Sequence, residues 1–126
     1  MRIKNGFTLI EVMIAMVIMS TVLLAMVAAT SSLIHVVAVA DRNASALQLV
    51  DSRIERIQLD PNYASLDSAY VGTETNFPTL TGFIRTTTIV RFGGSGQAVD
   101  HKKVTVTVTG PGVPDPVSRT ITMAAP

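Results

Sequence analysis

The stretch "KNGFTLIEVMIAMVIMS", residues 4–20, decides the fold, because an apolar run begins there immediately after a Gly-Phe pair. Residues 12–34 carry no charge, and the uncharged run extends to Ala40 when His35 is neutral. About 20 apolar residues are enough for a helix to cross a bilayer. The sequence therefore predicts a transmembrane helix. Its one carboxylate, Glu11, needs an explanation, since a carboxylate in hydrocarbon costs roughly 2.5–3.5 kcal/mol.

The charges that flank the apolar run predict its orientation. Arg2 and Lys4 precede the run, which favours a cytoplasmic N-terminus and places everything after Ala40 outside. Without these two residues the chain has eight basic side chains against nine acidic ones, so the body is near neutral and bulk charge gives no support for direct binding of nucleic acid. The absence of cysteine excludes disulfides and thiolate metal sites.

The helix is expected to continue beyond the membrane. Neither Gly nor Pro occurs from Phe7 through Asp60, and Asp60-Pro61-Asn62 supplies a stop signal. Between residues 41 and 60 the apolar side chains recur every three or four positions, which is typical of an amphipathic helix that packs on a domain. The residues predicted to lie under that domain are Leu47, Val50, Ile54 and Ile57.

The C-terminal part of the chain has the alternation of strands. Residues 61–82 show no clear period and are predicted to be a loop or a short extra element. Strands are expected within residues 83–124, namely at 83–92, 103–109 and 117–123, joined by the turn-rich connectors "GGSGQAVDH" and "GPGVPDP". The predicted fold class is α+β, a long N-terminal helix (residues 7–40 in the membrane, 41–60 amphipathic) packed on a small antiparallel sheet.

On sequence physics alone, the first residues allow a secretory signal or an uncleaved anchor, and Glu11 allows a functional or a structural role. A secretory signal would be cut after Ala38-Val39-Ala40, but the apolar run is far longer than the 7–15 residues typical of such signals. An uncleaved anchor explains the length but not Glu11. A structural role for Glu11 also stays open, because Thr8 and Glu11 have the spacing of a helix capping box and a carboxylate is favourable in a first turn.

The segment "KNGFTLIEVMIAM" resembles the N-terminus of type IV prepilins and of the pseudopilins of type II secretion. In that family a short basic leader ends in glycine, and a membrane peptidase cuts after it and methylates the new N-terminal residue. The resemblance implies a leader at residues 1–6, cleavage between Gly6 and Phe7, and N-methylation of Phe7.

The resemblance also implies a role for Glu11 in assembly. In the family, this glutamate pairs with the N-terminal amine of a neighbouring subunit in the filament. A carboxylate left alone in an apolar environment is penalised and pairing relieves the penalty, so the same group gives a docking force and an axial register.

The rest of the chain resembles the V-type minor pilins and the I-type minor pseudopilins more than the major pilins. It lacks the proline that many major pilins carry in the helix and their C-terminal disulfide loop. The implied partners are other pilin or pseudopilin subunits in a hetero-oligomer, the prepilin peptidase, the assembly platform of the bacterial inner membrane, and membrane lipid. Pilus, secretion and competence systems all stay open, and the domain of residues 41–126 is expected to be periplasmic.

No catalytic, cofactor or metal site is expected. His35 and His101 are far apart in the sequence and have no partner at metal-ligand spacing, and no serine lies in a G-x-S-x-G motif. The expected function is that of a non-enzymatic minor pilin or pseudopilin. The main alternative is a permanently anchored periplasmic binding module that never assembles.

Overall fold

The computed structural model describes residues 6–126, so the expectations for the leader residues 1–5 lie outside the described part. Contacts divide the chain into two compact units, with the boundary between Val37 and Ala38. Helix α1 (Leu9–Gln58) contributes to both units. Each unit is described by itself.

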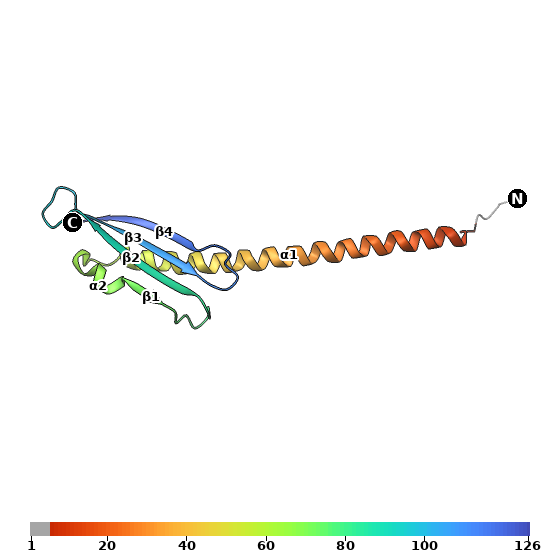
Figure 1. Ribbon diagram of the computed structural model, residues 1–126, viewed down its shortest axis with the longest axis horizontal. Helices are drawn as coiled ribbons and strands as arrows, with labels where there is room; N and C mark the ends of the chain where they lie inside the picture. Colours follow the sequence, from red (N-terminus) through yellow and green to blue (C-terminus); the bar gives the residue numbers. More distant parts are fainter. Residues whose placement is uncertain (1–5) are drawn as a thin grey trace. The chain divides into compact units, whose positions relative to one another are not determined.

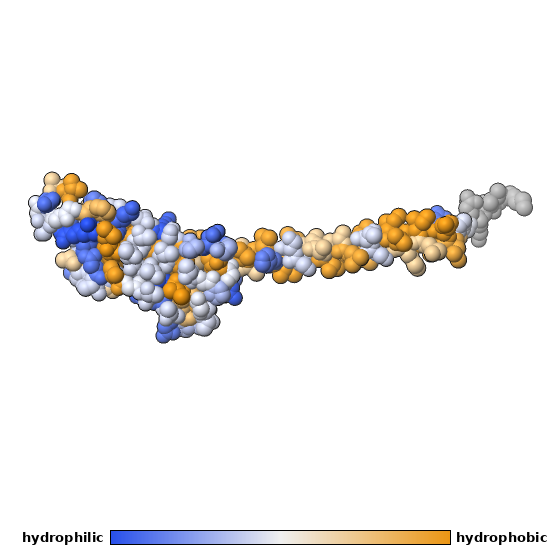
Figure 2. All heavy atoms as spheres, in the orientation of Figure 1, coloured by the Kyte–Doolittle hydropathy of each residue, from blue (hydrophilic) through white to orange (hydrophobic). Residues whose placement is uncertain are grey.

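The first unit consists of the N-terminal half of α1, whose apolar side chains are exposed. Its most apolar stretch has a mean hydropathy of 2.6 with no buried residue, and within residues 6–126 α1 alone is long and apolar enough to span a membrane. Figure 2 shows the apolar surface of this half. Four of its hydroxyls, those of Ser20, Thr21, Thr30 and Ser31, donate to backbone carbonyls of the helix, with Ser20 Oγ 2.8 Å from Met16 O and Thr30 Oγ1 2.9 Å from Met26 O. Such bonds satisfy polar groups where lipid offers no partner.

The second unit packs the C-terminal half of α1 on one antiparallel sheet, which confirms the predicted α+β arrangement (Figure 1). The sheet has the order β1-β2-β3-β4, and each strand pairs antiparallel with the next in the chain. The strands are β1 (Gly72–Glu74), β2 (Ile84–Phe92), β3 (His101–Thr109) and β4 (Val117–Ala124). The last three begin and end within two residues of the predicted strands.

The core of the second unit lies between α1 and the inner face of the sheet. Alternate residues of β3 point inward and are fully buried, as its strict alternation requires. They meet the inner stripe of α1 together with Phe83, which precedes β2. The buried apolar residues are Ala46, Val50, Ile54, Ile57, Leu66, Phe83, Val104, Val106 and Val108.

The stripe of α1 that faces the sheet differs from the predicted one at its first position. Val50, Ile54 and Ile57 are buried, but Leu47 is 48% exposed and Ala46 takes its place at 0%. Each helical residue is rotated by about 100° from the last. Ala46 therefore lies nearer the centre of the buried stripe than Leu47, and its small side chain lets the helix approach the sheet closely. The expectation that Leu47 packs under the sheet is wrong.

Residues 61–82 contain short elements. They are the 3-10 helix η1 (Tyr63–Ser65), helix α2 (Leu66–Tyr70) and strand β1. Each is too short to give a period in the sequence, and contacts from other elements hold them. Leu66 is buried in the core, and Glu74 of β1 accepts a hydrogen bond from Arg85 Nε of β2 at 2.7 Å. The fourth strand of the sheet therefore comes from the region expected to be a loop.

The outer face of the sheet is lined with hydroxyls. One row across the strands consists of Thr73, Thr86, Thr107 and Ser118, and the next of Thr88, Thr105 and Thr120. Hydrogen bonds join neighbours within the rows, with Thr105 Oγ1 and Thr120 Oγ1 at 3.0 Å. This face is the polar counterpart of the valine face of β3.

Candidate functional site

The junction between Gly6 and Phe7 lies in a segment without regular secondary structure before α1. Both residues are exposed, with Phe7 at 83%, and the helix begins at Leu9. The backbone on either side of the predicted cleavage point is therefore accessible. A peptide bond outside regular structure has no helical hydrogen bonds to break before it is cut.

The chain itself does not require glycine at position 6. A Cβ added to Gly6 would meet no atom within 4 Å, and the residue does not have the positive φ that favours glycine. By contrast, a Cβ at Gly93 would lie 1.6 Å from Val99 O, so the fold does require glycine there. The fold of the described residues therefore sets no requirement for glycine at position 6.

Glu11 lies in the first turn of α1, where Thr8 caps the helix. The Glu11 N–H donates to Thr8 O at 3.1 Å and, more weakly, to Thr8 Oγ1 at 3.4 Å. This is one half of a capping box, whose other half would be a bond from the Thr8 N–H to the Glu11 carboxylate. No such bond occurs among residues 6–126, so the carboxylate itself is left without a partner in the described chain.

Phe7 and Glu11 border the same shallow hollow on one side of the first unit. The hollow is otherwise lined by small and flexible apolar residues, among them Ala15, Met16 and Met19. Phe7 reaches this hollow from the segment before α1, and Glu11 reaches it from the first turn of the helix. The hollow is therefore an exposed apolar surface whose Met side chains can adapt to irregular neighbours.

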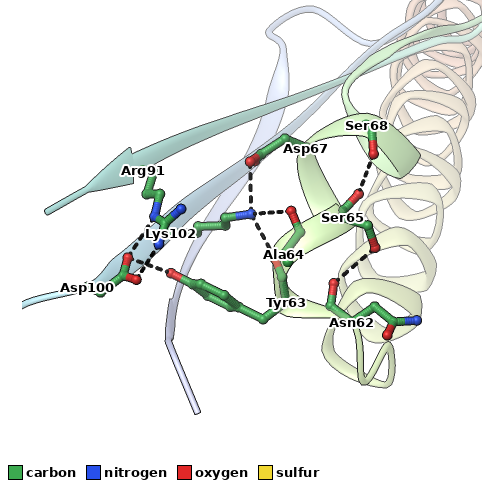
Figure 3. A network of polar contacts seen from close by, with 9 residues as sticks. All are labelled: Asn62, Tyr63, Ala64, Ser65, Asp67, Ser68, Arg91, Asp100 and Lys102. Atoms are coloured by element: carbon green, nitrogen blue, oxygen red, sulfur yellow. Dashed lines mark hydrogen bonds and ion pairs between the residues drawn. The ribbon is translucent and has the colours of Figure 1, made fainter. Parts of the chain in front are cut away.

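The sequence did not single out a second polar site, in which Lys102 is buried under η1 and α2 (Figure 3). Lys102 Nζ donates to Tyr63 O at 2.7 Å and forms an ion pair with Asp67 Oδ2 at 2.8 Å. It also lies 4.8 Å from the centre of the Tyr63 ring. The alternation of β3 could have indicated that Lys102 is buried, because Lys102 lies an even number of residues before the three inward valines and so points to the same face.

Arg91 and Asp100 extend this polar cluster toward the ends of β2 and β3 (Figure 3). Arg91 Nε donates to Asp100 Oδ1 at 2.8 Å and Arg91 also forms an ion pair with Asp100 Oδ2, while Tyr63 Oη donates to Asp100 Oδ1 at 3.3 Å. The hydrogen bonds from Arg91 lower the pKa of Asp100, and burial followed by the charge of Asp100 raises the pKa of Tyr63. The cluster fixes η1 to the sheet.

We expect Lys102→Met to destabilise the full chain by about 2–4 kcal/mol, because it keeps the apolar stem but leaves the buried carbonyl of Tyr63 without its donor. Urea unfolding in non-ionic detergent, followed by tyrosine fluorescence, measures the effect. Lys103→Met is the matched control: Lys103 is exposed on the opposite face of β3, and its replacement should change the free energy of unfolding by less than about 0.5 kcal/mol. Equal stability of the two variants would contradict a structural role for the buried ammonium.

The remaining titratable groups form no metal centre. Among residues 6–126 no three His, Asp or Glu side chains come close enough to share a metal ion. His35 is an exposed residue of α1, and the ring of His101 stacks on Phe92 at 5.2 Å.

Among known proteins and families, a match is found for the N-terminal segment of the chain. No curated protein and no solved structure matches the chain significantly. Residues 1–27 match the family model described as the prokaryotic N-terminal methylation motif. The matched segment includes Gly6, Phe7 and Glu11 and the first turns of α1. The chain therefore carries a type IV prepilin-like signal, followed by an apolar helix that fits a single-pass membrane anchor.

Proposed function

We propose that this protein is a precursor subunit of a type IV pilus or of a type II secretion pseudopilus, in a minor position. The observation that carries the proposal is the register of Gly6, Phe7 and Glu11 at the start of an exposed, membrane-length apolar helix that bears the N-terminal methylation motif. The architecture, a long helix packed on a small antiparallel sheet, also supports the proposal.

The proposed sequence of events has three steps. The chain is first held in the bacterial inner membrane by α1, with its N-terminus cytoplasmic and its sheet domain in the periplasm. A prepilin peptidase then cuts after Gly6 and methylates Phe7. Finally the helix leaves the lipid and joins other pilin-like subunits at the assembly platform, where Glu11 pairs with the N-terminal amine of a neighbour. The subunit itself performs no catalysis in this scheme.

The carboxylate of Glu11 supports the assembly step. Its side chain has no partner within the described chain, and the surrounding helix surface is apolar. Cleavage after Gly6 creates an α-ammonium on Phe7, and methylation keeps that charge. An opposite charge supplied by another chain is the simplest way to relieve the cost of the carboxylate in an apolar bundle.

Intact mass of the chain purified from membranes tests the proposal. The expected species lacks residues 1–6 and carries one additional methyl group on Phe7. A chain that keeps its first residues would favour the alternative, a permanently anchored periplasmic binding module. An N-terminus at Asp41 would instead show cleavage at the A-x-A sequence of a secretory signal.

A further inference from the structure

Three arginines surround a small polar cavity in the second unit. The cavity has a volume of about 70 Å³ and is lined by Ser52, Arg53, Arg56 and Arg85. The first three belong to α1 and the fourth to β2, so the cavity lies where the helix meets the sheet. The N-terminal motif assigns no role to these residues.

Arg53 is held in place by the groups around it. Its Nε donates to Thr87 Oγ1 at 3.3 Å, and its Nη2 donates to Tyr70 O at 3.2 Å and lies 3.3 Å from Glu74 Oε1. The guanidinium also lies 5.0 Å from the centre of the Tyr70 ring. No hydrogen bond within residues 6–126 uses its Nη1, which keeps two N–H donors free.

Arg85 is fixed in a similar way from the other side of the cavity. Its Nε and Nη2 both contact Glu74 Oε2, at 2.7 and 2.6 Å, and its Nη1 donates to Leu49 O at 3.0 Å. The ring of Phe77 lies 5.1 Å away and covers the guanidinium. Two of the three arginines are therefore rigid and largely buried, with side chains 9% and 11% exposed.

The residues that line the cavity carry three positive charges and no negative charge. Glu74 is the one carboxylate that pairs with Arg53 and Arg85 among the described residues, and Arg56 forms no ion pair there. Burial lowers the pKa of Arg53; Glu74 opposes this effect, and Arg85 and Arg56 add to it. Three guanidinium groups therefore border the cavity while one carboxylate pairs with two of them, and the N–H groups of Arg53 that form no bond within residues 6–126 are accessible to solvent.

We propose that this cavity binds one small oxyanion: a carboxylate, sulfate or phosphate group. A cavity holds a water molecule when it offers about 10–15 Å³, so 70 Å³ accommodates a single such group and excludes a nucleotide. Planar guanidinium groups donate pairs of parallel hydrogen bonds to oxyanions, which makes arginine the preferred ligand for them. Glu55 and Asp60 line the adjoining groove beside Arg56, so recognition comes from the directed donors more than from bulk charge.

The oxyanion has two sources, an acidic group of another chain or a free inorganic anion. The full chain in non-ionic detergent is titrated separately with sodium acetate and sodium sulfate, while sodium chloride keeps the ionic strength constant. The NMR signals of the arginine Nε–H groups report binding. We expect saturable shifts at Arg53 and Arg85. Saturation with acetate alone assigns the site to carboxylates and so to a partner chain, whereas saturation with sulfate alone assigns it to tetrahedral anions.

Arg56→Gln tests whether the three arginines act together. Arg56 is exposed, so its replacement should leave the fold intact while it weakens anion binding about tenfold, through the loss of a charge-assisted donor. Arg42→Gln is the matched control, since Arg42 is exposed on the same helix but lies outside the cavity and its loss removes the same charge. Equal weakening by both variants, or shifts that grow linearly without saturation, would overturn the proposal. Neither result would affect the test by mass of the N-terminus, because the cavity does not depend on processing.

Discussion

Glu11→Leu is expected to abolish incorporation of the subunit into filaments while its level in the membrane stays normal or rises. A leucine removes a cost of roughly 2.5–3.5 kcal/mol from the lipid-embedded helix, so insertion improves. The same change removes the charge that would meet the α-ammonium of a neighbouring chain. Crosslinking to, or co-purification with, pilin-like partners measures incorporation, with filament or secretion output as a second readout.

Glu11→Gln separates the charge from the shape of the side chain. It keeps the size and the hydrogen-bonding groups but cannot form an ion pair, so it should also fail if pairing drives assembly. Thr30→Ala is a control within the same helix: the Thr30 hydroxyl donates to Met26 O of its own chain and lies outside the hollow that Glu11 borders, so its loss should leave assembly unchanged. Normal assembly of both Glu11 variants would exclude pairing and leave Glu11 with the role of a capping residue beside Thr8.

Gly6→Val is expected to leave the precursor uncut and Phe7 unmethylated. The substitution causes no strain in the chain, since a Cβ at position 6 has open space around it. It adds bulk only against a molecule that must approach the backbone closely, as a peptidase does. The mass of the membrane-bound chain gives the result directly, and loss of processing should be almost complete.

Gly6→Ala adds a single methyl group at the same place and should reduce processing less than Gly6→Val. This graded response is the signature of a steric limit at the peptidase. Rapid cleavage of Gly6→Val after residue 6 would contradict the proposed processing. Cleavage of either variant before Asp41 would identify a secretory signal.

The sequence predicted the long helix and three of the four strands because each rests on a local pattern. The uncharged run and the absence of Gly and Pro mark α1, and the alternation of residues 103–109 marks β3. Each pattern continues over the whole element, so all the residues of that element favour the same secondary structure. The predicted strands consequently match the observed ones closely.

Residues 61–82 were not predictable in detail because residues far away in the sequence hold them in place. Helix α2 has five residues and β1 has three, which is too short for a period to appear. The Lys102 ammonium from β3 fixes η1 and α2, and Arg85 from β2 fixes β1. Ala46 was overlooked for a related reason: its burial depends on how closely the helix approaches the sheet, and composition does not show this.

The roles predicted for the N-terminal residues in cleavage, methylation and assembly stay predictions, although the segment that carries them was recognisable from the sequence. Gly6, Phe7 and Glu11 lie in one short motif, and the match over residues 1–27 falls on the same segment. The arginine cavity had no such signal, since Arg53, Arg56 and Arg85 come from two elements that the sequence separates by a loop. Only the packed fold places them together.

The hydroxyl rows on the outer face of the sheet have a consequence for how the protein survives before it finds its partners. Threonine is branched at Cβ and favours strands as valine does, yet its hydroxyl keeps the surface hydrated. Thr86, Thr88, Thr105 and Thr107 thus stabilise the pleated conformation without making an apolar patch. A sheet of the same shape with valine at these positions would be prone to stacking against copies of itself. The threonines therefore keep the middle of the outer face hydrated between the exposed apolar side chains of Ile84, Val90 and Phe92.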